Sequence, residues 1–344
     1  MNQIDQKDRR ILQQLDMHAR LPINEIAKNV QCSREIVEYR IQRLHKLGII
    51  SGAHTIFDLD LIGYRSFRLL LRLFKLNKEE KERFIHYLIT HHHTWWVASI
   101  GGRWDIIINV LAKDASQFNH IFEEFVTRYG QYIQEYEILT YINIHDYARK
   151  YILSHKSEKK DQIQHSKLNS KSSSQFYHPM QYNPHLSLDT TDLHILTQLA
   201  NNAQHSYTQI AEEVGLTRNA IKARIHSLEK NGLILGYRLS FHPSKFGRSS
   251  YLLLLNINNL KQERERELIT FAELNSNIIF VVKHIGKYRI TFECEVENEY
   301  HFHELLSEIR DRFNDIILDF DFFPIFYDHK INYFPLGNIS LPKI

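Results

Sequence analysis

Residues 33–52, SREIVEYRIQRLHKLGIISG, decide how the chain folds. Val37, Ile41 and Leu44 recur at helical spacing, so one face of this segment is apolar and the other is polar. Ser33 is suited to cap the first turn, and the glycine at position 48 is suited to end the helix. The segment therefore predicts one helix whose apolar face is buried in a small domain.

Two shorter helices are expected before this segment. Asp5 stands before a helical pattern of apolar residues, and Pro22 opens a second short pattern. Three helices with a tight turn at residues 31–33 make a helix-turn-helix, in which the last helix enters the major groove of DNA. After the third helix, Ile49 to Phe57 are expected to form a short strand pair of the winged-helix type.

The whole pattern occurs twice in the 344-residue chain. A shift of 184 residues aligns Arg34 with Arg218 and Leu44 with Leu228, and positions 4–64 share 20 identities in 61 with the second copy. The agreement continues without a gap beyond position 100. The chain is therefore a tandem duplication of a module with two parts.

A different pattern follows position 63 of the first copy and its equivalent in the second. Its segments follow the order strand, helix, two strands, helix and strand, which is the ferredoxin-like βαββαβ arrangement. The helices cover one face of such a sheet, while the other face is apolar and aromatic here and needs a partner sheet. The expected fold class is α+β, with two winged helix-turn-helix domains and two ferredoxin-like domains.

Changes in composition suggest the domain boundaries. The tract between the copies is polar, rich in Ser, Lys and Gln, and has no apolar period, which indicates a flexible linker with a reach of roughly 30 Å. The expected units are a winged helix-turn-helix domain at residues 1–64, a ferredoxin-like domain at 65–153, the linker at 154–184, a second winged helix-turn-helix domain at 185–248 and a second ferredoxin-like domain at 249–335.

Each module begins with Asp-x-x-Asp-x-x-Ile-Leu and continues with Arg-Ile-x-x-Leu-x-x-x-Gly-x-Ile-x-Gly ahead of the βαββαβ pattern. This order resembles the Lrp/AsnC transcription regulators over roughly residues 3–150 and 187–334. The resemblance implies a sequence-specific DNA-binding regulator whose sheet domains pair. Ordinary members have one module per chain, so we expect the two sheets of this chain to pack face to face as an intramolecular pseudo-dimer, or to assemble into a higher oligomer.

The polar face of the third helix is expected to contact double-stranded DNA. Arg218 and Asn219 suit base edges and Lys222 suits phosphates, whereas copy one places Glu35 and Glu38 on this face, where they repel phosphate. Copy two should therefore bind DNA better, unless both faces are ordinary solvated surfaces. The candidate DNA-binding residues are Ser33, Arg34, Glu35, Glu38, Tyr39, Arg40 and Arg43 in copy one and Thr217, Arg218, Asn219, Lys222, Arg224 and His226 in copy two.

A glycine-rich turn in copy one is the second candidate site. In the family this turn lies where amino-acid effectors bind, so the resemblance implies that Asp105 meets an ammonium group beside Gly101, Gly102 and Trp104. Copy two has Arg289 in place of the acid, so effector sensing is expected in copy one alone. A hairpin whose glycines merely permit the turn is the alternative.

The sequence shows few features typical of membrane proteins, metal-binding proteins or cofactor-binding proteins. No apolar run is long enough to cross a bilayer and the amino terminus is polar, so we expect a cytoplasmic protein without a membrane partner. Cys32 and Cys294 stand far apart, and the consecutive histidines at 91–93 diverge, so no cofactor and no metal site are expected. A subunit that assembles with relatives but binds no DNA is an alternative function.

One class of enzymes resembles this architecture. Siroheme decarboxylases occur as fused pairs of the same two-part module, and they carry a His-Asn-Tyr segment with a following Arg near the second strand of the sheet domain. The equivalent segments here, residues 94–99 and 278–283, read TWWVAS and IIFVVK. Neither carries the pattern, so we expect no catalytic residues and no enzyme activity.

Overall fold

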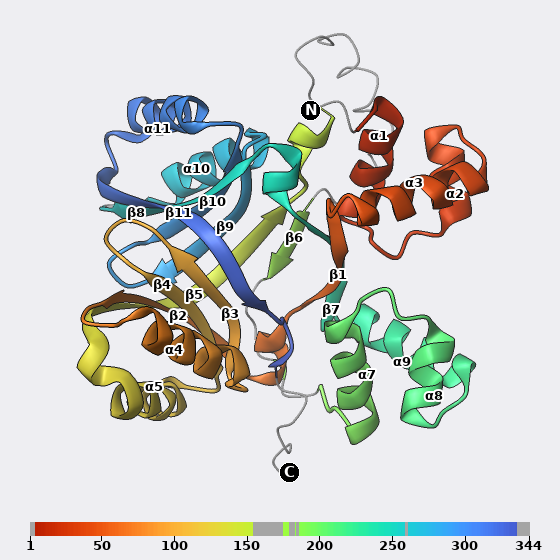
Figure 1. Ribbon diagram of the computed structural model, residues 1–344, viewed down its shortest axis with the longest axis horizontal. Helices are drawn as coiled ribbons and strands as arrows, with labels where there is room; N and C mark the ends of the chain where they lie inside the picture. Colours follow the sequence, from red (N-terminus) through yellow and green to blue (C-terminus); the bar gives the residue numbers. More distant parts are fainter. Residues whose placement is uncertain (1–3, 154–174, 179–182, 184–185, 259–260, 336–344) are drawn as a thin grey trace.

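The computed structural model describes residues 4–153, 175–178, 183, 186–258 and 261–335 of the chain. Nearly every helix and strand of the first copy has a counterpart that begins 184 residues later, as the repeat predicts. Figure 1 shows the helix-turn-helix units of both copies at one end of the molecule and the larger sheet with its helices at the other. None of the helices in the described part of the chain is long and apolar enough to cross a membrane.

Three helices form the amino-terminal part of each copy, as the sequence predicts. The third helix of copy two buries its whole expected apolar face. In copy one Val37 and Leu44 are fully buried, while Ile41 is half-buried against the same core. These elements are α1 (Gln6–Asp16), α2 (Ile23–Val30), α3 (Arg34–Lys46) and β1 (Ile50–Phe57) in copy one, and α7 (Thr190–Asn201), α8 (Tyr207–Val214), α9 (Arg218–Lys230) and β7 (Ile234–Phe241) in copy two.

The expected wing hairpin is wrong. Ile50–Phe57 is one continuous strand, β1, and it pairs in antiparallel fashion with β7 of the other copy, so that Ala53 lies opposite Leu239. A strand of eight residues without an internal turn cannot fold back on itself, and its backbone groups need a partner elsewhere. The wing strands therefore join the two helix-turn-helix units instead of completing each one separately.

The ferredoxin-like parts have the predicted element order. Copy one contains β2 (Arg65–Leu73), α4 (Lys78–Thr90), β3 (Thr94–Ile100), β4 (Ile106–Ala112), α5 (Ala115–Tyr129) and β5 (Ile133–Tyr147). Copy two contains β8 (Ser249–Ile257), α10 (Gln262–Leu274), β9 (Ile278–Ile285), β10 (Ile290–Val296), α11 (Glu299–Phe313) and β11 (Ile317–Ile331). Short 3-10 turns connect the parts at Leu59–Ile62, Gly130–Tyr132, Lys150–Ile152 and Pro243–Phe246.

The two sheets pack face to face as expected, and their edges are in addition hydrogen-bonded to each other. Their strands follow the order β2-β4-β3-β11-β8-β10-β9-β5, and β5 also pairs with β2, so the sheet closes into a barrel. The long strands β5 and β11 make this possible, because the first half of each pairs within its own copy and the second half pairs with the other copy. A single hydrogen-bonded ring thus unites both copies.

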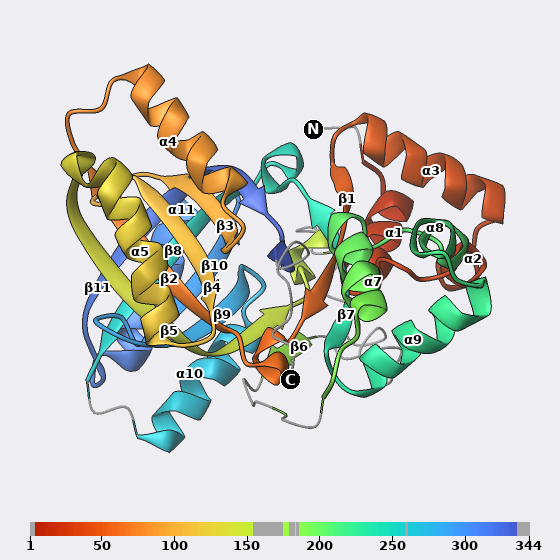
Figure 2. The ribbon, with the colours of Figure 1, turned by 90° about the horizontal axis from the view of Figure 1, so that it is seen from below.

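The apolar sheet faces meet inside this barrel, which satisfies the need for a partner sheet. The interior contains Leu70 and Trp104 of copy one against Leu252, Tyr288 and Phe323 of copy two. Helices α4 and α5 cover the outer face of one half, and α10 and α11 cover the other (Figure 2). The intramolecular pseudo-dimer is therefore present, with its core inside a closed barrel.

The tract between the copies is not a linker throughout. Gln175–His178 forms β6, which pairs with the end of β5, while residues 154–174 lie outside the described part. Phe176 of β6 is buried against Gly236 on β7, where an added Cβ atom would come within 2.3 Å of the ring. The glycine at this position is therefore required for the close approach of β6 to the wing strands.

A cluster of buried charges holds the parts together. Arg149, just after β5, bonds Asp16 of α1 at 2.8 Å and Glu295 of β10 at 3.1 Å. Arg238 of β7 forms an ion pair with Asp146 of β5 and lies 3.7 Å from Asp16. All five side chains are at most 8% exposed, and they come from both helix-turn-helix units and both halves of the barrel. Losing one member would leave an unpaired buried charge, which is costly.

Cutting the tract between the copies should leave the two halves associated, because the barrel ring and the buried charges join them without the linker. The test is a protease site inserted within residues 156–172, followed by cleavage and size-exclusion chromatography under native conditions. We expect the fragments to co-elute at the position of the uncut chain. Two separate peaks would contradict the intrachain barrel.

Candidate nucleic-acid interface and central cavity

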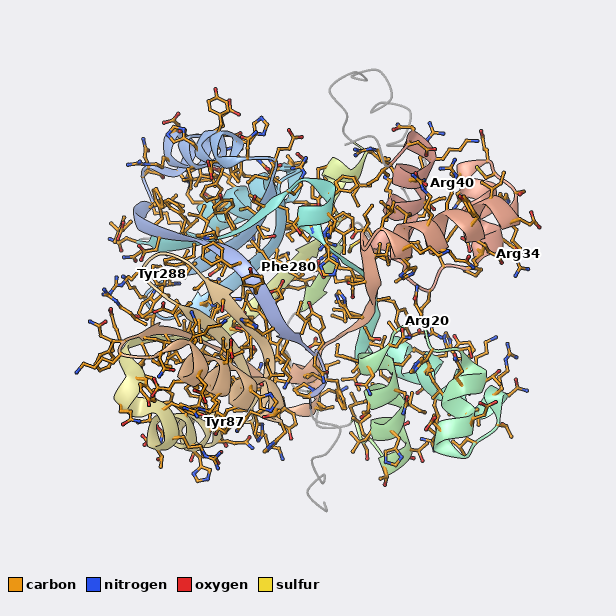
Figure 3. All side chains as sticks on the ribbon, viewed as in Figure 1. Arg20, Arg34, Arg40, Tyr87, Phe280 and Tyr288 are labelled. Carbon is orange, nitrogen blue, oxygen red and sulfur yellow. The ribbon has the colours of Figure 1, made fainter. Side chains whose placement is uncertain are left out.

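Helices α3 and α9 carry the candidate DNA-binding side chains. Ser33 and Thr217 cap them as predicted, since their hydroxyl groups accept hydrogen bonds from the backbone N–H of Ile36 and Ala220. Figure 2 shows the two helices on opposite sides of the paired helix-turn-helix units, and Figure 3 shows Arg34 at the outer edge, away from the barrel. The predicted polar faces are therefore open to a partner.

The relative position of the two helix-turn-helix units is fixed by Arg20. Its guanidinium donates to the backbone carbonyl of His205 at 2.9 Å and lies over the rings of Tyr207 and Tyr237. Figure 3 shows Arg20 between the two units. Together with the pairing of β1 and β7, this contact prevents the two helices from moving independently.

The outward face of α9 carries two exposed cationic side chains, Arg218 and Lys222. Arg218, Asn219 and Lys222 are exposed, and within the described part of the chain neither Arg218 nor Lys222 has an ion-pair or hydrogen-bond partner. His226 is also exposed and lies 3.7 Å from Glu229. Arg218 and Lys222 are therefore available for phosphates or base edges.

The corresponding face of α3 is different. Arg34 donates to Glu38 at 2.7 Å, one helical turn away, so its charge is offset within the helix. Glu35 is exposed beside it, and Tyr39 is 66% exposed. The face predicted to be less favourable for phosphate is thus acidic and self-paired in the structure.

Three of the candidate arginines have partners inside their own domain. Arg40 bonds Asp5 and Asp8, Arg43 bonds Asp8, and in copy two Arg224 bonds both Asp189 and Asp192. These aspartates also cap the first helix through reciprocal bonds with the backbone. The arginines therefore tie the third helix to the start of the first, a role that the repeated Asp-x-x-Asp and Arg positions could have indicated.

The glycine-rich turn at residues 101–105 makes contacts that stabilise the fold. Asp105 accepts a hydrogen bond from the backbone N–H of Leu73 at 2.7 Å, and Trp104 is fully buried in the barrel. Gly101 packs so closely that an added Cβ atom would lie 2.7 Å from the ring of Phe326, and Gly102 has a φ of +94°. An effector at this turn would have to share Asp105 with β2, and its presence there stays a prediction.

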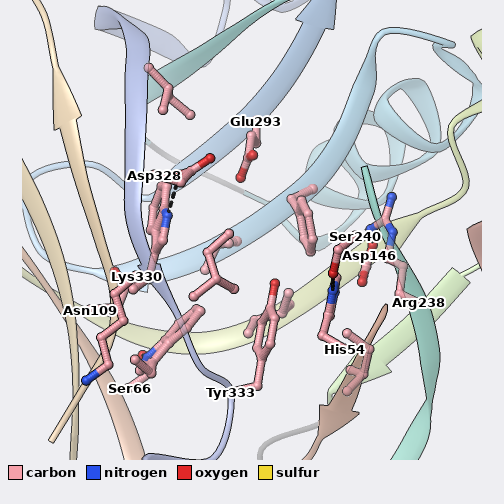
Figure 4. Close-up of a pocket in the computed structure, with 18 of the residues that line it drawn as sticks. His54, Ser66, Asn109, Asp146, Arg238, Ser240, Glu293, Asp328, Lys330 and Tyr333 are labelled. Carbon is pink, nitrogen blue, oxygen red and sulfur yellow. Dashed lines mark hydrogen bonds and ion pairs between the residues drawn. The ribbon is translucent and has the colours of Figure 1, made fainter. Parts of the chain in front are cut away.

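A cavity of about 380 Å³ lies between the barrel and the β1–β7 pair. Figure 4 shows its polar lining, with His54 and Ser240 from the wing strands on one side and Glu293 and Asp328 from the barrel on another. The cavity could not be predicted from the sequence, because its walls come from segments that lie far apart in the chain. Its lining includes Arg68, Trp95, Trp96, Asn109, Tyr141, Asp146, Arg149, Arg238, Phe280, Glu295, Lys330 and Tyr333.

Burial changes the proton affinity of several groups in this lining. It raises the pKa of Glu293 to about 7, and the neighbouring carboxylates of Asp328 and Glu295 add to the shift. Burial also lowers the pKa of His54 to about 3 and that of Lys330 to about 8. The cavity therefore disfavours ionised groups that have no partner.

Residues 4–45 match the AsnC-type helix-turn-helix domain, and residues 188–234 match a winged helix-turn-helix DNA-binding family. An uncharacterised HTH-type transcriptional regulator of Pyrococcus furiosus is 30% identical over 125 residues, which are 36% of this chain and 81% of that protein. The regulator LrpA of Pyrococcus horikoshii is 36% identical over 94 residues, which are 27% of this chain and 63% of LrpA. The chain therefore belongs to the Lrp/AsnC family of transcription regulators.

Over nearly its whole length the chain also resembles a solved structure of an enzyme. The siroheme decarboxylase NirDL superimposes with a TM-score of 0.60 at 10% sequence identity, over 96% of this chain and 95% of that one. At this identity the likeness shows the fold alone. It confirms that the complete tandem arrangement, and not only each module, occurs in another protein.

Glu293→Gln should stabilise the protein at alkaline pH. The raised pKa means that folded Glu293 holds a proton that the unfolded chain releases above its ordinary value of 4.5. Its contribution is thus complete below about pH 4.5 and is lost as the pH rises through 7. We expect thermal denaturation to show a gain of about 1–3 kcal/mol at pH 8 and much less at pH 5.

The exposed Glu308→Gln on α11 is the matched control for this experiment. It should change stability little at either pH, because a solvated carboxylate has no burial penalty to lose. An equal effect of Glu293→Gln at pH 5 and pH 8 would contradict the assignment of Glu293 as a half-buried carboxylate whose charge is unfavourable.

Proposed function

We propose that the chain binds double-stranded DNA as a sequence-specific transcription regulator and that α9 is its main reading helix. The proposal rests on Arg218 and Lys222, two exposed side chains on the capped third helix of a helix-turn-helix that have no ion-pair or hydrogen-bond partner among the described residues. An arginine can bind guanine through two hydrogen bonds, and a lysine contacts phosphate as a point charge. The family membership supports DNA as the partner.

The two copies are proposed to contribute unequally. In α3 the side chain equivalent to Lys222 is Glu38, which occupies Arg34 in an ion pair. Bringing this face to DNA would place carboxylates near phosphates, where they repel. The first copy is therefore proposed to position the second through the β1–β7 pair and Arg20, with a smaller direct contribution to affinity.

Substitutions on α9 should weaken DNA binding more than the matched substitutions on α3. Lys222→Ala should lower affinity for all sequences and reduce the salt slope by about 1, while Arg218→Ala should relax base preference at a cost of about 1–3 kcal/mol. Glu38→Ala and Arg34→Ala are the equivalent changes in copy one. Binding to selected and random duplexes at several salt concentrations measures both effects, and equal losses from the two copies would refute the unequal contribution.

A second function has one observation in its favour, namely the superposition of the whole chain on the siroheme decarboxylase NirDL. Against it, the segments 94–99 and 278–283 form parts of β3 and β9 and contain no histidine. They bring Trp95, Trp96 and Phe280 to the cavity instead. His54, His242 and His329 also line the cavity, but they come from other segments than the one in which the decarboxylases carry their histidine.

Incubation of the purified protein with siroheme under reducing, anaerobic conditions distinguishes the two functions. We expect no loss of carboxyl groups when the tetrapyrrole is analysed by mass spectrometry, with heat-denatured protein as the background. A time-dependent decarboxylated product would establish the enzyme function and would make DNA binding the function to be questioned.

A further inference from the structure

The central cavity lies on the pseudo-twofold axis of the duplication. Most residues that line it come from positions 184 apart, such as Ser66 with Ser250 and Trp96 with Phe280. In a homodimer of single modules each such pair would be identical, whereas the fused chain is free to differ at each position. The pairs that differ in charge or polarity include Asn109 with Glu293, His54 with Arg238, Asp146 with Lys330, Arg149 with Tyr333 and Leu111 with Glu295.

One wall of the cavity carries hydrogen-bond donors without acceptors. Arg68 is 3% exposed, and its Nε atom donates to Asn109 Oδ1 at 3.2 Å while another nitrogen donates to the hydroxyl of Tyr141. These bonds fix the guanidinium, but Arg68 Nη1 and Asn109 Nδ2 are buried and have no hydrogen-bond partner among the residues that the structure describes. Two adjacent, fixed donors on a cationic wall suit a carboxylate.

The opposite edge of the cavity is acidic. Figure 4 shows Glu293 and Asn109 at different edges of the cavity, and the pseudo-twofold axis that relates their positions lies between them. Asp328 accepts a hydrogen bond from Trp96 Nε1 at 2.8 Å, while Glu293 has no hydrogen-bond or ion-pair partner among the described residues. A carboxylate held in this position without a partner weakens the fold, so it calls for a cationic group from outside the chain.

Aromatic rings line the space between the two edges. Trp95 donates its Nε1 proton to Ser66 at 2.8 Å, and its ring lies 5.4 Å from that of Tyr333, which in turn stacks on His54 at 4.8 Å. Because the polar atom of Trp95 is already bonded, its ring contributes an apolar surface. A flat body is the shape that such surfaces accept best.

We propose that the central cavity is a binding site for a flat organic zwitterion, whose carboxylate bonds Arg68 and Asn109 and whose cationic group at the far end of the ring meets Glu293. The charges of this ligand are separated by its body, because the two groups that bind them lie at opposite edges of the cavity. The volume of about 380 Å³ suits a small molecule. The site does not depend on the proposed DNA binding, although β1 and β7 contribute to its wall.

The probe 4-(aminomethyl)benzoate has this chemistry, and benzoate and benzylamine each lack one of its charges. Trp95 and Trp96 line the cavity, so quenching of tryptophan fluorescence reports binding, and calorimetry confirms the stoichiometry of one. We expect the full-length chain to bind the zwitterion at least about tenfold more tightly than either fragment. Equal affinity for all three probes, or no binding of the zwitterion, would overturn the proposal.

Two substitutions separate the two ends of the ligand. Arg68→Leu should weaken benzoate and the zwitterion by about tenfold or more, while Arg72→Leu at the exposed end of the same strand should leave both unchanged. Glu293→Gln should remove the preference for the zwitterion over benzoate without weakening benzoate. This variant is expected to be more stable than the parent chain, so a loss of binding cannot be attributed to unfolding. Retention of the preference in Glu293→Gln would refute the cationic contact.

Discussion

The buried bonds of Arg149 to Asp16 and Glu295 are the contacts on which the arrangement of the four domains depends. Burial alone would raise the pKa of Asp16, but Arg238 and Arg149 hold it below its ordinary value. The charges are therefore stable only while the domains that supply them stay together. A cluster of this kind stabilises one arrangement of the domains, because every arrangement that separates its members leaves a buried charge unpaired.

Fusion of two modules changes what the fold can do. In a symmetric dimer each position near the axis is used twice, so a charge placed there faces its own copy. In this chain the equivalent positions have diverged, and the result is visible both in the cavity and on the exposed faces of α3 and α9. Asn109 and Glu293 differ at the cavity, and Glu38 and Lys222 differ at the surface. One chain thus combines a symmetric scaffold with two asymmetric surfaces.

Much of this fold could be predicted because the signals are local. The apolar periods of the third helices and the caps at Ser33 and Thr217 lie within a few residues of one another, and the structure confirms both. The element order of the ferredoxin-like parts follows from the same kind of pattern. Because equivalent helices and strands begin 184 residues apart, each element predicted in one copy is also predicted in the other.

The features that were predicted wrongly, or not at all, depend on contacts between segments that lie far apart in the sequence. Whether β1 folds back or pairs with β7 is not determined by the residues of β1 alone, and the closure of the barrel depends on the second halves of β5 and β11. The cavity was missed for the same reason, since no short segment contains Arg68, Glu293 and Tyr333 together. The structural use of Arg40 and Arg224 was the one feature that their repeated spacing from the aspartates could have indicated.

Unfolding of Arg149→Leu tests most directly whether the buried charges unite the domains. In denaturant, far-ultraviolet circular dichroism follows the helices of both copies, and the fluorescence of Trp95, Trp96 and Trp104 follows the barrel. The parent chain should unfold in one transition by both probes, whereas Arg149→Leu should lose about 3–5 kcal/mol and unfold in two transitions, with the helix-turn-helix units melting before the barrel. A single coincident transition at unchanged denaturant concentration would contradict this account.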